Sequence, residues 1–410
     1  MKIQEYFKQF YNMSPYLNIT EEQWVHIKDT YPKDDVKLEL AKCAMTYPLP
    51  LVNITEQDAI DEYSRLKGVR WHEMLKEVEW FPRKAELSDD YPITMDGNYM
   101  LFKRYNGGNK ASDFFHQLNR WQVSGSQGPG PVRTWGNVKY MTSLMGALYS
   151  LKMDKVDSSA LRVCLSLRKY TCSQFKPSVA KSIYDYFKAE TILDFSMGWG
   201  DRLCGFYASE YGKHYIGLDP RLENHPIYVE QDKFYKKHNG FFEHTRSTEF
   251  HKEPAEDFDY TPYTNTVDLI FTSPPYFSVE RYSHDDTQSW VRYKEIDIWN
   301  KEFLHKALGK MIPTLKIGGK LVVNISDVYG TSGKERAYLS IVKPMCEFLT
   351  EQGLLYKGCI GMELAKRPNS GGAGKAKETE VNNWSEETLK SAEETKDIQF
   401  GEPCWIFEKI

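Results

Sequence analysis

From residue 139 onward the sequence alternates helical stretches with short apolar runs rich in β-branched residues, and no other feature constrains the fold as strongly. Such alternation is typical of an α/β protein, because successive strands of a parallel sheet need a crossover helix between them. The candidate strands are residues 191–196, 214–219, 268–273, 320–326, 354–364 and 402–410. The run between the last two is rich in Gly, Lys and Glu, so we expect residues 366–400 to form a mobile surface loop.

The first 125 residues lack this alternation and carry no catalytic motif. They mix helical-looking stretches with polar, aromatic-rich segments. A stretch rich in Gly, Pro and Ser follows at residues 123–136 and interrupts the chain. We therefore predict a mainly helical N-terminal domain of residues 1–125 and a catalytic domain of residues 126–410.

The first predicted strand leads from Asp194 into a turn with two glycines, which reads Phe195, Ser196, Met197, Gly198, Trp199 and Gly200. Glycines at such a turn let the backbone approach a ligand where a Cβ atom would clash, and the next helix begins with unpaired N–H groups. A nucleotide-like ligand is one interpretation. A tight strand-to-helix turn without a ligand is the other.

The second predicted strand ends in Asp219, one strand-helix-strand unit further on. A carboxylate at this position can accept hydrogen bonds from both hydroxyls of a ribose, as in dinucleotide-binding folds. The alternative is that Asp219 only caps the turn at Pro220.

The third predicted strand is followed directly by Ser273, Pro274, Pro275, Tyr276 and Phe277. Two prolines fix φ and lack N–H groups, so carbonyls in this segment can point into a site instead of pairing within a sheet. The alternative is a Pro-Pro turn that closes the strand over a buried tyrosine.

This segment resembles the SPPY motif of S-adenosylmethionine-dependent DNA amino-methyltransferases, which act on N4 of cytosine or N6 of adenine. The resemblance covers about residues 160–410 and extends in particular to orphan DNA methylases of phages and large viruses. It implies a Rossmann-like methyltransferase fold with a mostly parallel seven-stranded sheet that ends in an antiparallel hairpin. It also implies S-adenosylmethionine as the cofactor.

The resemblance assigns the chemistry to the SPPY segment. An exocyclic amine is a poor nucleophile because its lone pair is delocalised into the ring. In the family, the first motif residue and a proline carbonyl accept the two amine hydrogens, while the aromatic residue stacks on the extruded base. The implied catalytic residues are Ser273, Pro274, Pro275 and Tyr276, and the implied substrate-binding residues are Phe277, Arg281 and Tyr282. The methyl group would be displaced directly, and the chain has no Pro-Cys motif for a covalent intermediate.

The resemblance also implies the cofactor-binding residues. They are Phe175, Lys176 and Pro177 over the methionine end, Asp194, Ser196, Met197, Gly198 and Gly200 in the glycine turn, Asp219 at the ribose, and Glu256 or Asp257 at the adenine ring. Either of the last two could equally be a solvated surface carboxylate. The chain departs from the family at Phe195 and Ser196, where Pro-Phe or Pro-Cys is usual, and at Asp201, where glycine is usual. An extra carboxylate is tolerable beside a cationic sulfonium.

We therefore predict a DNA methyltransferase that modifies the exocyclic amine of adenine or cytosine. One alternative is the same chemistry on RNA or on a protein glutamine. Another is an inactive methyltransferase fold that binds nucleic acid. Serine in the first motif position is commoner in cytosine enzymes but also occurs in adenine enzymes, so the target base stays open. Target recognition is expected from the N-terminal part, residues 1 to about 150, which include the domain 1–125, or alternatively from the loop at Lys366 to Trp384.

The formal net charge is −4, so DNA binding would need a local basic groove. The candidate phosphate contacts are Arg133, Arg162, Lys169, Arg281, Lys366 and Arg367, and each is alternatively a solvated surface charge. The sequence has no signal peptide and no apolar run of membrane-spanning length, and its seven cysteines are scattered. We therefore expect no membrane partner, no metal and an intracellular, cytoplasmic location, which is the host cytoplasm if the gene is viral. The oligomeric state stays open.

Overall fold

The computed structural model describes residues 1–83, 85, 88–126, 128–240, 246–332, 335–364 and 399–410. The chain forms two compact units. Unit 1 comprises Met1–Ile54, His116–Ser173 and Glu280–Tyr282, and unit 2 comprises Thr55–Phe115, Gln174–Val279 and Ser283–Ile410.

This division differs from the predicted border at residues 125 and 126, for a reason visible in the hydrophobic cores. Trp24 and Leu40, near the N-terminus, share one core with Leu144 and Leu161. Residues 55–115 instead contribute buried side chains, such as Phe102, to a core of the sheet. Both units are therefore assembled from segments that are far apart in the sequence.

Unit 1 is mainly helical, and three of its helices, α2, α8 and α9, begin at side-chain caps. Its elements are α1 (Ile3–Phe7), η1 (Lys8–Phe10), α2 (Glu21–Thr30), α3 (Lys33–Ala44), α7 (Pro131–Trp135), α8 (Val138–Ser150), α9 (Ser158–Arg168), and the strands β4 (Ser124–Gly125) and β9 (Glu280–Arg281), which pair antiparallel. Helix α6 (Asn109–Gln122) contains the border between the units. Thr20 forms a capping box with Gln23 at the start of α2, and Asn137 and Asp157 cap α8 and α9.

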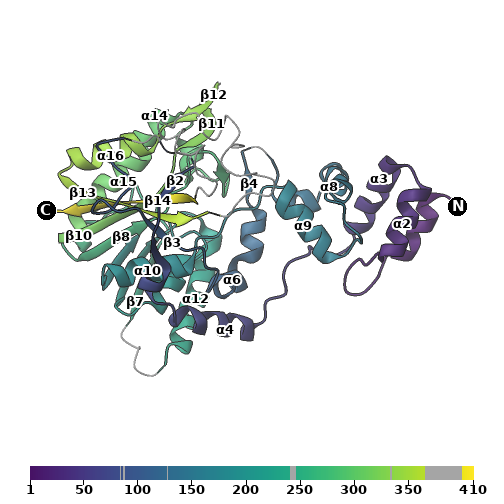
Figure 1. Ribbon diagram of the computed structural model, residues 1–410, viewed down its shortest axis with the longest axis horizontal. Coiled ribbons are helices and arrows are strands. Elements are labelled where there is room, and N and C mark those ends of the chain that lie inside the picture. The colour runs from purple at the N-terminus through teal and green to yellow at the C-terminus, as the bar shows by residue number, and fades with distance from the viewer. Residues whose placement is uncertain (84, 86–87, 127, 241–245, 333–334, 365–398) are drawn as a thin grey trace. The chain divides into compact units, whose positions relative to one another are not determined.

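Unit 2 contains a sheet whose central strands have the order β7, β6, β5, β8, β10, β14, β13. Their bounds are β5 (Thr191–Asp194), β6 (His214–Leu218), β7 (Ser247–His251), β8 (Val267–Thr272), β10 (Leu315–Asn324), β13 (Leu354–Glu363) and β14 (Gln399–Lys409). Strands β5, β6, β7, β8 and β10 are parallel, and β14 runs antiparallel to both β10 and β13. This order confirms the predicted Rossmann-like methyltransferase fold with its antiparallel hairpin (Figure 1).

The sheet is larger than the predicted seven strands. Three short strands, β1 (Leu75–Glu77), β2 (Trp80–Pro82) and β3 (Met100–Phe102), pair at its β13–β14 end and bring the total to ten. All six predicted strands are present, but β7 was not predicted, because Ser247–His251 is polar and nowhere fully buried. The predicted loop at 366–400 lies mostly outside the described residues. Its last two positions, Gln399 and Phe400, already belong to β14.

Helices cover both faces of this sheet. They are α4 (Glu56–Lys67), α5 (Trp71–Met74), α10 (Pro177–Tyr186), α11 (Asp201–Ala208), α12 (His225–His238), α13 (Ser289–Arg292), α14 (Ile296–Trp299), α15 (Lys306–Met311) and α16 (Val342–Glu351). Shorter elements are η2 (Leu222–Asn224), η4 (Thr261–Tyr263), the π-helical η5 (Asn300–His305), η6 (Ile312–Thr314), and the hairpin of β11 (Val328–Ser332) and β12 (Glu335–Leu339). In the described residues we find no helix with the length and apolarity needed to span a bilayer.

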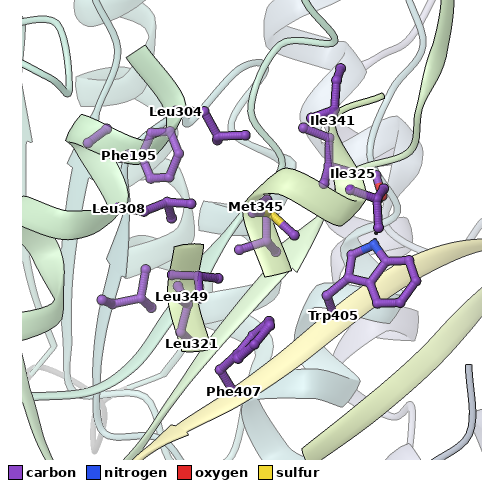
Figure 2. Packing of buried hydrophobic residues seen from close by; sticks show 14 of the residues in the cluster. Phe195, Leu304, Leu308, Leu321, Ile325, Ile341, Met345, Leu349, Trp405 and Phe407 are labelled. Carbon is purple, nitrogen blue, oxygen red and sulfur yellow. Dashed lines mark hydrogen bonds between the residues drawn. The ribbon is translucent and has the colours of Figure 1, made fainter. Parts of the chain in front are cut away.

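Neighbouring residues of a strand pack on opposite faces, as the pleat requires. Ile192 of β5 belongs to the core beside α10 and α11, whereas Leu193 belongs to the core beside α15 and α16. Figure 2 shows the second core, where Leu308, Met345 and Phe407 lie together. Because both faces are buried, the central strands read as continuous apolar runs.

His305, at the end of η5, makes the stability of this core sensitive to pH. Its ring stacks on Phe348 of α16 with centroids 4.5 Å apart, and its Nε2 has no hydrogen-bond partner in the described part of the chain. Burial lowers the pKa of His305 from 6.5 to about 4. The folded state therefore favours neutral histidine, so this contribution to stability is complete above pH 6.5 and is lost as the pH falls through about 4.

We expect a His305→Phe variant to lose less stability than the wild type when the pH is lowered from 6.5 to about 4. Phenylalanine keeps the stacking on Phe348 and cannot be protonated. The measurement is the free energy of unfolding from urea titrations across this pH range. Parallel pH profiles for the two proteins would show that His305 does not cause the effect.

Candidate active site

The turn after β5 holds its two glycines in the left-handed region, with φ of 59° at Gly198 and 68° at Gly200. The N–H of Gly198 donates to Asp219 Oδ2 at 3.2 Å, and its carbonyl accepts from Tyr228 Oη at 2.5 Å. Gly200 is the N-cap of α11, and a Cβ atom there would lie 2.1 Å from Gln231 Oε1. The turn therefore favours glycine at both positions through its positive φ, and at Gly200 a Cβ atom would also clash with Gln231.

Asp194, at the end of β5, is fully buried and bonded to protein groups. Its carboxylate accepts from Arg202 Nε at 2.7 Å and Nη2 at 3.1 Å, from Tyr215 Oη at 2.6 Å, and from the N–H of Ser196 at 3.2 Å. Burial by itself lowers the pKa of Arg202, but Asp194 outweighs that effect and the pKa is raised. Asp194 therefore shapes the glycine turn through Arg202 and Ser196, and its oxygens already have protein donors.

Asp219, at the end of β6, is 8% exposed and holds two loops at once. Its Oδ1 accepts from the N–H of Arg221 at 2.8 Å, and its Oδ2 accepts from Gly198 and, at 2.7 Å, from Tyr228 Oη. Burial is the main cause of its raised pKa. Asp219 thus caps the turn at Pro220, which was the alternative to a role in ribose binding. A carboxylate has about four acceptor positions, so Oδ1 can still accept from a ligand hydroxyl.

Ser196 connects the glycine turn with the SPPY segment. Its Oγ lies 2.6 Å from Thr272 Oγ1 and donates to the carbonyl oxygen of Ser273 at 2.9 Å. β5 and β8 are parallel neighbours, so their carboxyl ends meet at one edge of the sheet. The hydroxyl that departs from the family pattern is therefore the group that joins the two motifs. The Ser273 hydroxyl itself has no hydrogen-bond partner among the residues that the structure describes.

Tyr276 and Phe277 have different environments. Tyr276 is half-buried and its hydroxyl donates to Oε1 of Glu402 on β14. Phe277 is 1% exposed, has a φ of 51°, and packs edge-on against Trp299 with ring centroids 5.9 Å apart. Phe277 is thus part of the core, and of the two rings only Tyr276 is partly exposed. Glu402 was missed from the sequence because no local pattern marks it.

The other two predicted substrate-binding residues, Arg281 and Tyr282, belong to unit 1, whereas Ser273 and Tyr276 belong to unit 2. Arg281 is in strand β9. The hydroxyl of Tyr282 donates to Glu280, which also accepts from Tyr170 Oη at 2.6 Å. In unit 1, Tyr282 therefore joins Glu280 and Tyr170 in a half-buried polar cluster.

The segment before α10 lies against the start of α11. Gln174 Nε2 donates to Asp201 Oδ1 at 2.9 Å and to Ser112 Oγ at 2.8 Å. The Phe175 ring lies 5.1 Å from the Arg202 guanidinium. Asp201, which replaces a family glycine, is thus occupied in fixing this segment. Lys176 Nζ donates to Asn106 Oδ1 at 2.9 Å, and Pro177 is the first residue of α10.

Glu256 and Asp257 follow β7 and share one cation, because Arg292 Nη1 lies 3.0 Å from Glu256 Oε1 and 2.6 Å from Asp257 Oδ2. Glu256 is buried, and burial raises its pKa. Asp257 is exposed, and its hydrogen bond with Arg292 lowers its pKa. Asp257 thus matches the surface-carboxylate interpretation, whereas the Glu256 carboxylate is buried beside Arg292. The described residues include no group of His, Cys, Asp and Glu suited to hold a metal ion.

No family model and no curated protein sequence matches the chain. Among solved structures, it is similar to an S-adenosylmethionine-dependent O-methyltransferase from Thermotoga maritima, with 14% identity over 58% of this chain and 67% of that one and a TM-score of 0.32. It is also similar to an S-adenosylmethionine-dependent methyltransferase from Archaeoglobus fulgidus (16% identity, 57% and 95% covered, TM-score 0.31) and to the [4+2]-cyclase SpnF (12%, 58% and 84%, TM-score 0.33). Likenesses this distant identify no function, so the fold assignment rests on the strand order.

Proposed function

We propose that the protein is an S-adenosylmethionine-dependent methyltransferase that modifies the exocyclic amine of adenine or cytosine in DNA. One observation carries the proposal. The Ser196 hydroxyl, in the glycine turn, donates to the main-chain oxygen of Ser273 at 2.9 Å. A turn suited to the cofactor and a segment suited to an amine thus adjoin at the carboxyl edge of a parallel sheet, where open α/β sheets bind their ligands.

The cofactor would be held by the glycine turn, by Asp219 and by Phe175. Gly198 and Gly200 leave the backbone without Cβ atoms at the turn, and α11 begins there at Gly200 without a side-chain cap. Oδ1 of Asp219 would accept from a ribose hydroxyl. Asp194 contributes indirectly, by holding Arg202 and Ser196. When bound, S-adenosylmethionine supplies an electrophilic methyl group on a cationic sulfur.

The amine would be held by Ser273 and Pro274. The carbonyl of Ser273 is engaged by Ser196, so the acceptors for the two amine hydrogens are the Ser273 hydroxyl and the Pro274 carbonyl. Two acceptors draw the nitrogen toward tetrahedral geometry and localise its lone pair. The Tyr276 ring, steadied by Glu402, would stack on the extruded base. The proton leaves to solvent after methylation, so no dedicated base is required.

The test is incubation of the purified protein with methyl-labelled S-adenosylmethionine and unmethylated DNA of mixed sequence, followed by mass spectrometry of the nucleosides. We expect N6-methyladenine or N4-methylcytosine. Cofactor binding without a methylated nucleoside would contradict DNA as the substrate and favour RNA or a protein glutamine. Absence of cofactor binding, measured by calorimetry, would favour an inactive fold that binds nucleic acid.

A further inference from the structure

Charge is distributed very unevenly within unit 1. Residues 116–173 contain eight Lys and Arg side chains but only two Asp, a net charge of +6 in a protein whose total is −4. Residues 1–54, in the same unit, contain six basic and seven acidic side chains. The excess positive charge of unit 1 therefore comes from the segment that carries α7, α8 and α9.

Four of these cations lie along α8 and the end of α9. Arg168 Nη2 donates to Ser150 Oγ at 3.1 Å, and Lys169 Nζ lies 5.9 Å from the centre of the Tyr140 ring. The last residues of α9 therefore lie against α8, which also bears the exposed Lys139 at its start and is followed by the exposed Lys152. We call Lys139, Lys152, Arg168 and Lys169 the α8–α9 basic surface.

The α8–α9 basic surface is not neutralised by carboxylates. In the described part of the chain, none of its four members forms an ion pair. Among the six lysines of residues 1–54, Lys37 pairs with Asp34 at 2.7 Å and Lys42 with Glu39 at 2.8 Å. The other four form no ion pair in the described part of the chain either, but residues 1–54 hold seven acidic side chains, so their net charge is not positive. Lys139, Lys152 and Arg168 are exposed and Lys169 is half-buried. Cations without carboxylate partners on adjoining helices create a positive potential that attracts a polyanion.

We propose that the α8–α9 basic surface binds the phosphate backbone of the duplex DNA on which the active site acts, an inference that rests on the proposed function. Ser143 on α8 is an exposed hydroxyl that suits a phosphate oxygen, whereas the hydroxyls of Ser150 and Ser166 already donate to main-chain carbonyls of their own helices. Contacts of this kind position a duplex without reading its sequence. Each phosphate neutralised releases counterions, which makes the affinity fall with salt.

The experiment compares two full-length variants with the same change in charge. The first neutralises the basic surface as K139Q/K152Q/R168Q/K169Q. The matched control is K2Q/K8Q/K28Q/K33Q, which removes four exposed lysines from residues 1–54 of the same unit. The readouts are the Kd for a fluorescent duplex of random sequence at several salt concentrations, the Kd for S-adenosylmethionine, and the circular dichroism spectrum.

We expect the first variant to bind duplex DNA about 10- to 100-fold more weakly than the wild type. The slope of log Kd against log salt should become smaller by about 3 to 4, since each lost phosphate contact removes about 0.9. The control should keep the wild-type slope, and both variants should keep the wild-type Kd for the cofactor.

Equal losses in the two variants, or no loss in the first, would overturn the proposal. Stronger competition by duplex RNA of the same length than by duplex DNA would overturn the choice of DNA. These outcomes are separate from the proposed function. If the wild type methylates DNA but the first variant binds DNA with the wild-type Kd, only the role of the α8–α9 basic surface is refuted. If the wild type binds DNA in a salt-dependent way but produces no methylated nucleoside, only the proposed methyltransferase activity is refuted.

Discussion

Replacing Ser273 with alanine is expected to lower the kcat of DNA methylation by about 100-fold and to leave the Kd for S-adenosylmethionine unchanged. The Ser273 hydroxyl has no hydrogen-bond partner among the described residues and is therefore available to accept from the amine. The main-chain oxygen that joins Ser273 to the glycine turn is unaffected by the change. Single-turnover methylation and calorimetry of the cofactor separate the two effects.

Ser278→Ala is the matched control, because Ser278 is a half-buried serine five positions further along the chain. It should methylate DNA at nearly the wild-type rate. Tyr276→Phe keeps the ring but loses the bond to Glu402, whereas Tyr276→Ala also loses base stacking, which contributes about 1–3 kcal/mol. A Ser273→Ala variant with wild-type kcat, or with a proportionate loss of cofactor affinity, would refute the role given to this hydroxyl.

Replacing Asp194 with alanine is expected to lower the free energy of unfolding by about 3–5 kcal/mol. Arg202 is 4% exposed, and without Asp194 its guanidinium would remain buried without its carboxylate partner. Tyr215 and the N–H of Ser196 would also lose an acceptor. Urea unfolding, monitored by tryptophan fluorescence, measures the loss.

The double variant Asp194→Ala/Arg202→Met is the control, since it removes both charges together. We expect it to be more stable than the Asp194→Ala variant alone, because no unpaired charge stays buried. A stable Asp194→Ala variant that has lost only its cofactor affinity would contradict this account. That result would instead support a direct contact between Asp194 and the cofactor, as its position in the sequence indicates.

Much of the architecture of unit 2 follows from local sequence patterns. Its central strands are apolar runs because both faces of the sheet are covered, and this pattern located all six predicted strands. The strand β7 escaped prediction because its residues are polar and only half-buried. The turn after β5 could also be predicted locally, because a positive φ is a property of single residues and glycine adopts it most readily.

The partners of the site residues were not predictable in this way. Asp194 and Asp219 were placed correctly at strand ends, but their oxygens are bonded to Arg202, Tyr215 and Tyr228. Glu402 meets Tyr276 from a position 126 residues away. The units are likewise built from separated segments, so the predicted border at residue 125 did not anticipate that residues 116–173 pack with residues 1–54.

The sequence by itself thus determined six of the seven central strands, the glycine turn, and which residue types stand at the carboxyl ends of those strands. Backbone preferences and the burial of a strand are properties of a few consecutive residues, and they can be read locally. Only the tertiary structure decided that Ser196 bonds Ser273, that Arg202 neutralises Asp194, and that four cations gather along α8. Those contacts depend on which strands pair and which helices pack. The pairing and packing are determined by how the whole chain buries its apolar surface, which no short segment specifies.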